Sequence, residues 1–205
     1  MAIKIIGTTS GQEADVNTAS KALLVLRVSA DGTILEPKPT YRAATAAVLV
    51  AAAGTAPFFL MYGSGTKTIR VQRIRISGLT LTAVAYLNIN LAKYSTAASG
   101  GTPTALTQVP LDSSIGAATL SLCSGYTAAP TAGTKVGDVS AIRIMGQATT
   151  AAAAGIPDFV DFDFRTITGN EEIYLRGTTQ GVGLYFNSAP ATAVSMLLEV
   201  EWTEE

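Results

Sequence analysis

Two pairs of carboxylates are the residues whose types and spacing come closest to chemistry. Asp161 and Asp163 stand two positions apart, as do Glu199 and Glu201, which in a strand puts both members of a pair on one face. Glycosidases use two carboxyl groups, and calcium binds several carboxylate oxygens. Neither pair has further acidic neighbours, so a solvated strand face or cross-strand ion pairs are the favoured interpretation. The arginines available for such pairs are Arg70, Arg73, Arg75 and Arg165.

Other groups that could carry chemistry are scarce. The sequence has no histidine, which removes the commonest general base and metal ligand. Cys123 is the single cysteine, and it is interpreted as a small buried side chain. The stretch GSGTKT at 63–68 lacks the spacing of a phosphate-binding loop and precedes a strand pattern, so a hairpin turn is expected. The sequence therefore predicts no enzymatic activity, no cofactor and no metal site.

Aromatic side chains suggest a second class of function. Tyr94, Tyr126, Tyr185 and Phe186 could form a sugar-binding platform if loops gathered them on one surface. Packing in the core or burial in an interface is the more common fate of such residues and is the favoured interpretation. A glycan-binding module stays the alternative.

Charge is scarce along the whole chain. The 14 lysines and arginines nearly balance the 15 acidic residues, and the net charge of −1 gives no electrostatic reason to bind nucleic acid directly. Charged residues make up 14% of the 205 positions, where about a quarter is usual. A net charge near zero favours association, so much of the surface is expected to be contact surface.

The uncharged segment 43–66, AATAAVLVAAAGTAPFFLMYGSGT, has the length of a membrane span. Many of its residues are alanines, and Gly54 and Pro57 interrupt its middle. The favoured interpretation is two buried strands, one ending near Val50 and one starting near Phe58, with no membrane partner.

Alternation of apolar and polar residues is the main local pattern. In YLNINLAK, Leu87, Ile89 and Leu91 share one face, and VDFDFR, EEIYLRG, GVGLYFN and MLLEVEW show the same period of two. Further strands are expected near residues 25, 48, 60 and 143, and helical periodicity is nowhere convincing. Short strands separated by Gly, Pro, Ser and Thr clusters predict an all-β fold, an antiparallel β-sandwich of the jelly-roll type.

The segment TIRVQRIRIS has a slipped alternation. Ile69 and Val71 lie on one phase, and Ile74 and Ile76 lie on the other. A β-bulge at Gln72 and Arg73 would keep all four apolar residues on the core face.

Two segments are expected to stand outside this core. Residues 1–39 are predicted to be an N-terminal arm with one strand, and residues 40–205 a β-sandwich domain with a loop-rich insertion at about 94–139. Ordering 94–134 costs far more backbone entropy than its few apolar side chains return, so a partner surface is expected to order it. The residues predicted to contact another subunit are Ile3, Ile5, Ile6, Leu106, Val109, Leu111 and Tyr126.

Several stretches resemble tailed-bacteriophage virion structural proteins, most closely the capsid cement or decoration proteins. They are GTTSGQEADVNTASKALLVLRV, TYRAATAA, FFLMYGSGTKTIRVQRIRIS and KYSTAASGGTPTALT, although the alanine-rich run 43–53 is longer than that pattern. The resemblance implies a β-sandwich subunit on the outer shell with no enzymatic activity.

The function expected from this resemblance is to bind and stabilise a capsid shell. The expected partners are the major capsid protein and copies of the chain itself, as a trimer or other homo-oligomer. The expected location is the virion, after assembly in the host cytoplasm. A neck or tail component, or a receptor-binding module that recognises a glycan, is the alternative.

Overall fold

The computed structural model describes residues 16–17, 22–23, 38–148, 159–165 and 172–205. The chain divides into two units, Met1–Lys38 and Pro39–Glu205. In the first unit, β1 (Val16–Asn17) pairs antiparallel with β2 (Ala22–Leu23). Ile3, Ile5 and Ile6 and most of the strand expected near residue 25 lie outside the described residues.

The second unit is built from strands, and its described residues contain no helix. This confirms the all-β prediction. The strands are β3 (Thr40–Ala44), β4 (Leu49–Ala51), β5 (Pro57–Tyr62), β6 (Ile69–Leu81), β7 (Ala85–Tyr94), β8 (Thr102–Ala105), β9 (Thr107–Pro110), β10 (Leu122–Ala128), β11 (Lys135–Ala148), β12 (Phe159–Asp163), β13 (Ile173–Leu175), β14 (Gly181–Phe186) and β15 (Val194–Glu204).

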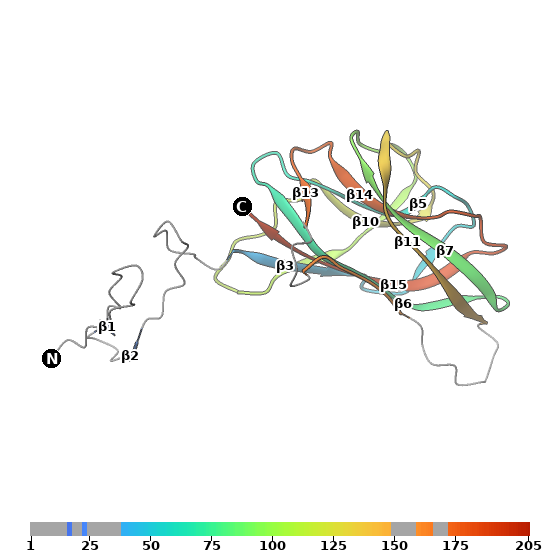
Figure 1. Ribbon diagram of the computed structural model, residues 1–205, viewed down its shortest axis with the longest axis horizontal. Helices are drawn as coiled ribbons and strands as arrows, with labels where there is room; N and C mark the ends of the chain where they lie inside the picture. The colour runs from blue at the N-terminus through green and yellow to red at the C-terminus, as the bar shows by residue number, and fades with distance from the viewer. Residues whose placement is uncertain (1–15, 18–21, 24–37, 149–158, 166–171) are drawn as a thin grey trace, which may run out of the picture. The chain divides into compact units, whose positions relative to one another are not determined.

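These strands form one large mixed sheet that is nearly closed into a barrel. The path runs β8-β10-β5-β14-β7-β11-β6-β15-β3-β9, with β12 and β13 also on β6 and β4 on β15. β11 and β6 pair in parallel, while the other pairings are antiparallel. Figure 1 shows β3, β6 and β15 on one side of the core and β5, β10 and β14 on the other.

The core follows the predicted alternation. Leu87, Ile89 and Leu91 of β7 are buried, and so is the apolar phase of β15 from Met196 to Trp202. The Trp202 ring stacks on Tyr41 of β3, with 5.7 Å between ring centroids. Side chains from both sides of the sheet therefore share one core.

The predicted bulge in β6 is confirmed. Against β15, Arg73 pairs with Glu201 and Val71 pairs with Trp202, which leaves Gln72 as the extra residue. The Gln72 carbonyl accepts a hydrogen bond from the Phe164 amide at 2.8 Å. The bulge returns the slipped alternation to one face. The apolar residues that it keeps buried are Ile69, Val71, Ile74 and Ile76.

The uncharged segment 43–66 contains the two predicted strands, β4 and β5, with the turn residues 52–56 between them. All six residues of β5 are buried. Within the described residues, no helix is long and apolar enough to cross a membrane. The segment is apolar because β5 is covered on both faces, with Phe59 and Met61 in the main core and Leu60 and Tyr62 in a second buried cluster.

The stretch predicted to be a loop-rich insertion supplies strands to both ends of the sheet. β8 and β10 lie at one end of the path and β9 at the other. Leu106 between β8 and β9 is buried, and its amide donates to the Cys123 carbonyl at 3.0 Å. Ile115 and Leu120 pack against the main core. The expectation that a partner surface orders residues 94–134 did not include these strand pairings and core contacts within the chain. Amino-acid composition alone does not reveal them.

Candidate functional sites

The two acidic pairs lie on the outer face of β12 and β15, in register with arginines on β3 and β6. Across four strands, Arg42 lies opposite Glu201, Glu201 opposite Arg73, and Arg73 opposite Asp163. Side chains at such positions lie within reach of each other on one face. We call this set the charge ladder. It comprises Arg42, Arg73, Asp161, Asp163, Arg165, Glu199 and Glu201.

Ion pairs connect the charge ladder. Arg73 pairs with Asp161, and Arg165 Nη2 lies 2.7 Å from Asp163 Oδ2. The side chain of Glu201 is nearly buried and accepts hydrogen bonds from Arg42 at 2.7 Å and from Arg165 at 3.1 Å. Pairing with Arg73 and Arg165 agrees with the sequence-based interpretation, whereas Arg42 was missed because it lies in a strand that was not predicted.

The guanidinium of Arg165, which hydrogen-bonds Asp163, lowers the pKa of that carboxyl to about 2. A general acid must hold its proton near neutral pH, and this environment opposes that role for Asp163. The remaining predicted arginines lie elsewhere. Arg70 pairs with Glu172 and Glu205, and the Arg75 guanidinium lies 4.6 Å from the ring centre of Phe159.

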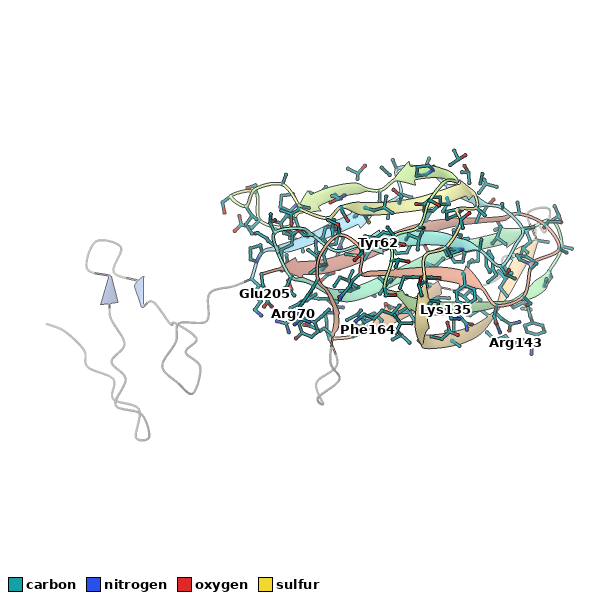
Figure 2. All side chains as sticks on the ribbon, turned by 90° about the horizontal axis from the view of Figure 1, so that it is seen from above. Tyr62, Arg70, Lys135, Arg143, Phe164 and Glu205 are labelled. Carbon is teal, nitrogen blue, oxygen red and sulfur yellow. The ribbon has the colours of Figure 1, made fainter. Side chains whose placement is uncertain are left out.

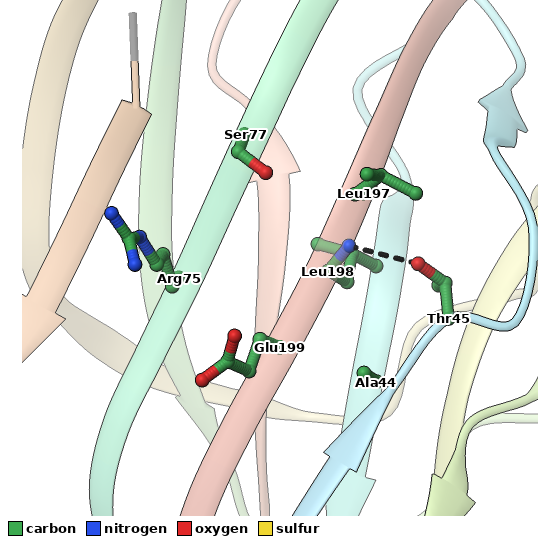
Figure 3. Close-up of a pocket in the computed structure, with 7 residues that line it drawn as sticks. All are labelled: Ala44, Thr45, Arg75, Ser77, Leu197, Leu198 and Glu199. Atoms are coloured by element: carbon green, nitrogen blue, oxygen red, sulfur yellow. Dashed lines mark hydrogen bonds between the residues drawn. The ribbon is translucent and has the colours of Figure 1, made fainter.

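An open hollow of about 370 Å³ lies beside the charge ladder (Figure 3). Of the four paired carboxylates, Glu199 alone lines it, and its Oε1 lies 3.4 Å from Arg42 Nε. The Leu198 amide donates to Thr45 Oγ1 at 3.1 Å along one wall. Among its lining residues, Glu199 is the single carboxylate, so the hollow does not hold the pair of carboxyl groups that a glycosidase uses. Its lining residues are Ala44, Thr45, Arg75, Ser77, Leu197, Leu198 and Glu199.

A second cluster occupies the other outer face, over β5, β7, β10 and β14. Its buried members are Leu60, Tyr62, Ala92, Tyr94, Tyr126 and Tyr185, and we call it the tyrosine cluster. The loop after β7 covers it, because Ala98 packs against these rings and its amide donates to Tyr62 Oη at 2.8 Å. Burial raises the pKa of Tyr94 to about 12.

The aromatic residues considered for a sugar platform are therefore not gathered on an open surface. Tyr94, Tyr126 and Tyr185 are buried in the tyrosine cluster, whereas Phe186 lies in the main core against Phe58, with 4.6 Å between ring centroids. Core packing, the favoured interpretation, describes their positions.

Glycines of β14 make room for the tyrosine cluster. A Cβ at Gly181 would lie 2.5 Å from the Tyr62 ring, and one at Gly183 would lie 2.5 Å from Leu60 Cδ2. A Cβ at Gly133 would collide with the Thr96 carbonyl, because the segments before β8 and before β11 approach each other closely. The small residues of this stretch thus allow close backbone approach within the chain.

At the rim of the tyrosine cluster, three polar side chains meet. Lys135 Nζ donates to Tyr185 Oη at 2.8 Å, and Tyr185 Oη donates to Asp138 Oδ1 at 2.9 Å. Burial alone would raise the pKa of Asp138, but hydrogen bonds from Lys135, Tyr185 and Asn90 outweigh it and lower that pKa. The pKa of Lys135 is raised by its hydrogen bonds to Tyr185 and Asp138. Lysine and aspartate thus stabilise each other's charged form and leave no neutral amine as a nucleophile.

Glu204 is a buried carboxylate that sequence reasoning missed. Its side chain accepts hydrogen bonds from the Thr119 amide and hydroxyl, both at 2.9 Å, and from Trp202 Nε1 at 3.1 Å. These donors satisfy a carboxylate that is 1% exposed and fix the segment before β10 to the core. The sequence could have indicated its burial, because Glu204 lies on the same face of β15 as the apolar residues Leu198, Val200 and Trp202.

In the turn GSGTKT, backbone amides donate hydrogen bonds to a side chain of the same turn. Ser64 Oγ accepts hydrogen bonds from the amides of Thr66 at 3.2 Å and Lys67 at 3.3 Å. β6 follows this turn as a strand, so no helix N-terminus faces it. The segment joins β5 to β6 as the expected turn.

The residues predicted to contact another subunit fall into three groups. Leu106 and Tyr126 are 3% and 5% exposed and pack inside their own chain, so they offer little surface to a partner. Val109 and Leu111 are 50% and 54% exposed at and after β9. The three isoleucines at positions 3, 5 and 6 lie outside the described residues.

Comparisons with protein-family models, curated proteins and solved structures find no match to this chain. In the part of the chain that the structure describes, no group of three or more His, Cys, Asp or Glu side chains could hold a metal ion. Cys123 is buried in the main core, and burial raises the pKa of its thiol to about 12.

Proposed function

We propose that this chain is a structural virion protein of a tailed bacteriophage, which binds the capsid shell and stabilises it as a cement or decoration protein. Its partners would be the major capsid protein and further copies of the chain. The sequence resemblance motivates the proposal. The single structural observation that favours it is the contrast between engaged polar groups and free apolar ones.

The polar groups most suited to chemistry are engaged within the chain. The acidic residues of the charge ladder face arginines, and three of the tyrosines considered for sugar binding are buried. Large exposed apolar side chains lie instead on β7, on β11 and on the turn before β7. Val84, Tyr86 and Met145 lie near one end of this strand pair, and Val136 and Val139 lie near the other.

This apolar surface has the residue types of protein interfaces. The Arg143 guanidinium lies 4.4 Å from the ring centre of Tyr86, and Met145 is paired with Tyr86 across the two strands. Tyrosine, methionine and arginine are enriched at protein–protein contacts. Figure 2 places Arg143 at the end of the core opposite Arg70 and Glu205. We propose that the partner of the surface around Tyr86 and Met145 is the capsid shell.

The finer fold class is part of this proposal. We propose that the two sides of the nearly closed sheet correspond to the two layers of a jelly-roll sandwich, the architecture that the resemblance implies.

The proposal is tested by binding to shells. Purified chain would be mixed with shells assembled from the major capsid protein of the same phage genome and sedimented with them. We expect saturable binding and a higher temperature of shell rupture. The variant Tyr86→Ser/Met145→Ser should lose binding, and the control Val48→Ser, which changes an exposed side chain outside this surface, should keep it.

Failure of wild-type chain to bind shells, both before and after their expansion, would overturn the proposal. Retention of the isolated chain on host surface polysaccharide instead would favour the receptor-binding alternative.

A further inference from the structure

The hollow beside the charge ladder forms where short side chains follow the charged positions on the outer face (Figure 3). Ser77 comes two residues after Arg75 on β6 and lies opposite Leu197 of β15 and Phe159 of β12. Ser77 and Ala44 are short, so they leave space between longer neighbours. Leu197 is 41% exposed and Phe159 is 53% exposed. The hollow therefore has apolar side chains at its border that solvent can reach.

Arg75 lines this hollow and has no ion pair or hydrogen bond among the described residues. Its register places it opposite Asp161 and Glu199, but Asp161 pairs with Arg73 and Glu199 pairs with Arg42. Figure 3 shows its guanidinium turned away from Glu199 and toward β12. Its Nε is buried without a hydrogen-bond partner, whereas its two Nη groups are not buried. The Nη groups are therefore donors that a ligand can reach.

The other polar groups of the hollow supply acceptors and further donors. Glu199 brings a carboxylate, whose Oε1 lies 3.4 Å from Arg42 Nε. Thr45 Oγ1 accepts the Leu198 amide at 3.1 Å, which leaves its own hydroxyl proton to donate. The Ser77 hydroxyl has no hydrogen bond among the described residues. The hollow thus offers both halves of a hydrogen bond within one small space.

The balance of charge selects the class of ligand. The three arginines of the charge ladder and Arg75 together equal its four carboxylates in number, so this face has no net attraction for an ion. An anion bound at Arg75 would also meet Glu199. A hydroxyl group is neutral and both donates and accepts, so neighbouring hydroxyls can serve Arg75 and Glu199 together. A volume of about 370 Å³ lies at the lower end of the range for small-molecule sites.

We propose that this hollow binds a neutral sugar, as the terminal residue of a glycan. Arg75 donates to a sugar oxygen, Glu199 accepts from a hydroxyl, and Leu197 and Phe159 pack against the apolar C–H face of the ring. Few polar groups that fix orientation beside an apolar wall are the usual composition of such a site. This inference goes beyond the proposed shell binding, which uses the surface around Tyr86 and Met145.

The inference is tested with isolated full-length chain on a panel of immobilised oligosaccharides. Neutral members end in glucose, galactose, mannose or N-acetylglucosamine, and acidic members end in glucuronic acid or sialic acid. We expect saturable binding to at least one neutral member, with little change on raising the salt concentration because no net charge is neutralised. The free methyl glycoside of the same sugar should compete, because the hollow holds a terminal sugar.

Three variants locate the bound sugar. Arg75→Met keeps an unbranched side chain against Phe159 but removes the donors, and it should weaken binding at least about tenfold. Ser77→Leu fills the hollow while keeping Arg75, and it should have a similar effect. Arg176→Met is the matched control, because Arg176 also lies over an aromatic ring but is exposed outside the hollow. Fluorescence of the buried Trp202 would verify that each variant is folded.

Four results would overturn the inference. They are an absence of binding to every neutral member, binding to acidic members alone, a free glycoside that does not compete, and wild-type affinity in both Arg75→Met and Ser77→Leu. Equal loss of affinity in Arg176→Met would likewise place the sugar elsewhere. Because shells are absent from these measurements, their failure leaves shell binding to be decided separately.

Discussion

The two outer faces of the sheet satisfy their side chains in opposite ways. On β3, β15, β6 and β12, the charge ladder lies on the outer face, and each carboxylate pairs with an arginine on a neighbouring strand or just after β12. On β5, β14, β7 and β10, the tyrosines are covered by a loop that is rich in small residues. One face pairs charged side chains, most of them partly exposed, and the other buries aromatic side chains in a second core.

This difference predicts where stability resides. Exposed ion pairs contribute little because water and salt screen them and long side chains lose freedom. Buried aromatic area and satisfied buried hydrogen bonds contribute much more. Damage to the tyrosine cluster should therefore cost more free energy of unfolding than damage to the charge ladder.

The largest effect is expected from Gly183→Val. The new side chain would meet Leu60 Cδ2 at 2.5 Å and the Phe59 carbonyl at 2.8 Å, in a strand paired on both sides. Overpacking of this kind lowers the free energy of unfolding by about 2–3 kcal/mol. Urea denaturation measures it, and Gly54→Ala is the control because a Cβ there meets nothing within 4 Å.

Tyr62→Phe should have the next largest effect. It removes the hydroxyl that accepts the Ala98 amide at 2.8 Å and leaves that donor without its partner under the covering loop. We expect a loss of about 1–2 kcal/mol in unfolding free energy. Tyr86→Phe, on an exposed ring, is the matched control. Equal values for the two variants would mean that the loop does not depend on this hydrogen bond.

Glu201→Gln tests the best-buried member of the charge ladder. The carboxylate is 7% exposed and serves both Arg42 and Arg165, so neutralising it weakens two charge-assisted hydrogen bonds. We expect a loss of about 1 kcal/mol, smaller than that of Gly183→Val. A loss above that of the glycine variant would reverse the proposed ranking of the two faces.

Acid titration of Asp163 should give the smallest effect. Its folded-state pKa of about 2 lies below its ordinary value, so its contribution to stability is present above about pH 4 and is lost as the pH falls toward 2. The side chain is 37% exposed, so that contribution should stay below about 1 kcal/mol. The difference in unfolding free energy between wild type and Asp163→Asn should shrink toward zero between pH 4 and pH 2.

Sequence reasoning succeeded where side chains alternate strictly. The strands of Leu87, Phe162 and Trp202 and the bulge at Gln72 were predictable because one buried face imposes a period of two and a slip in that period requires an extra residue. The pairing of Asp161 and Asp163 with arginines followed from the same period.

Sequence reasoning failed where small residues show no alternation of apolar and polar side chains. Ala, Ser, Thr, Gly and Pro give β8, β9 and β10 no contrast between faces, and their role depends on which strands they meet. Gly125 shows this, since a Cβ there would lie 2.6 Å from Leu49 Cδ2 of β4, a contact far away in sequence. The burial of Tyr126 beneath that stretch was unpredictable for the same reason.

The place of β15 in the sheet sets the order of events during folding. β15 pairs with β3, β4 and β6, so its partners, such as Tyr41 opposite Trp202, were synthesised more than a hundred positions earlier. Contacts between such distant residues close large loops and slow folding. Until β15 docks, β3 and β6 each expose an edge to other chains. The newly made protein is therefore most vulnerable to misassociation before β15 pairs with β3 and β6.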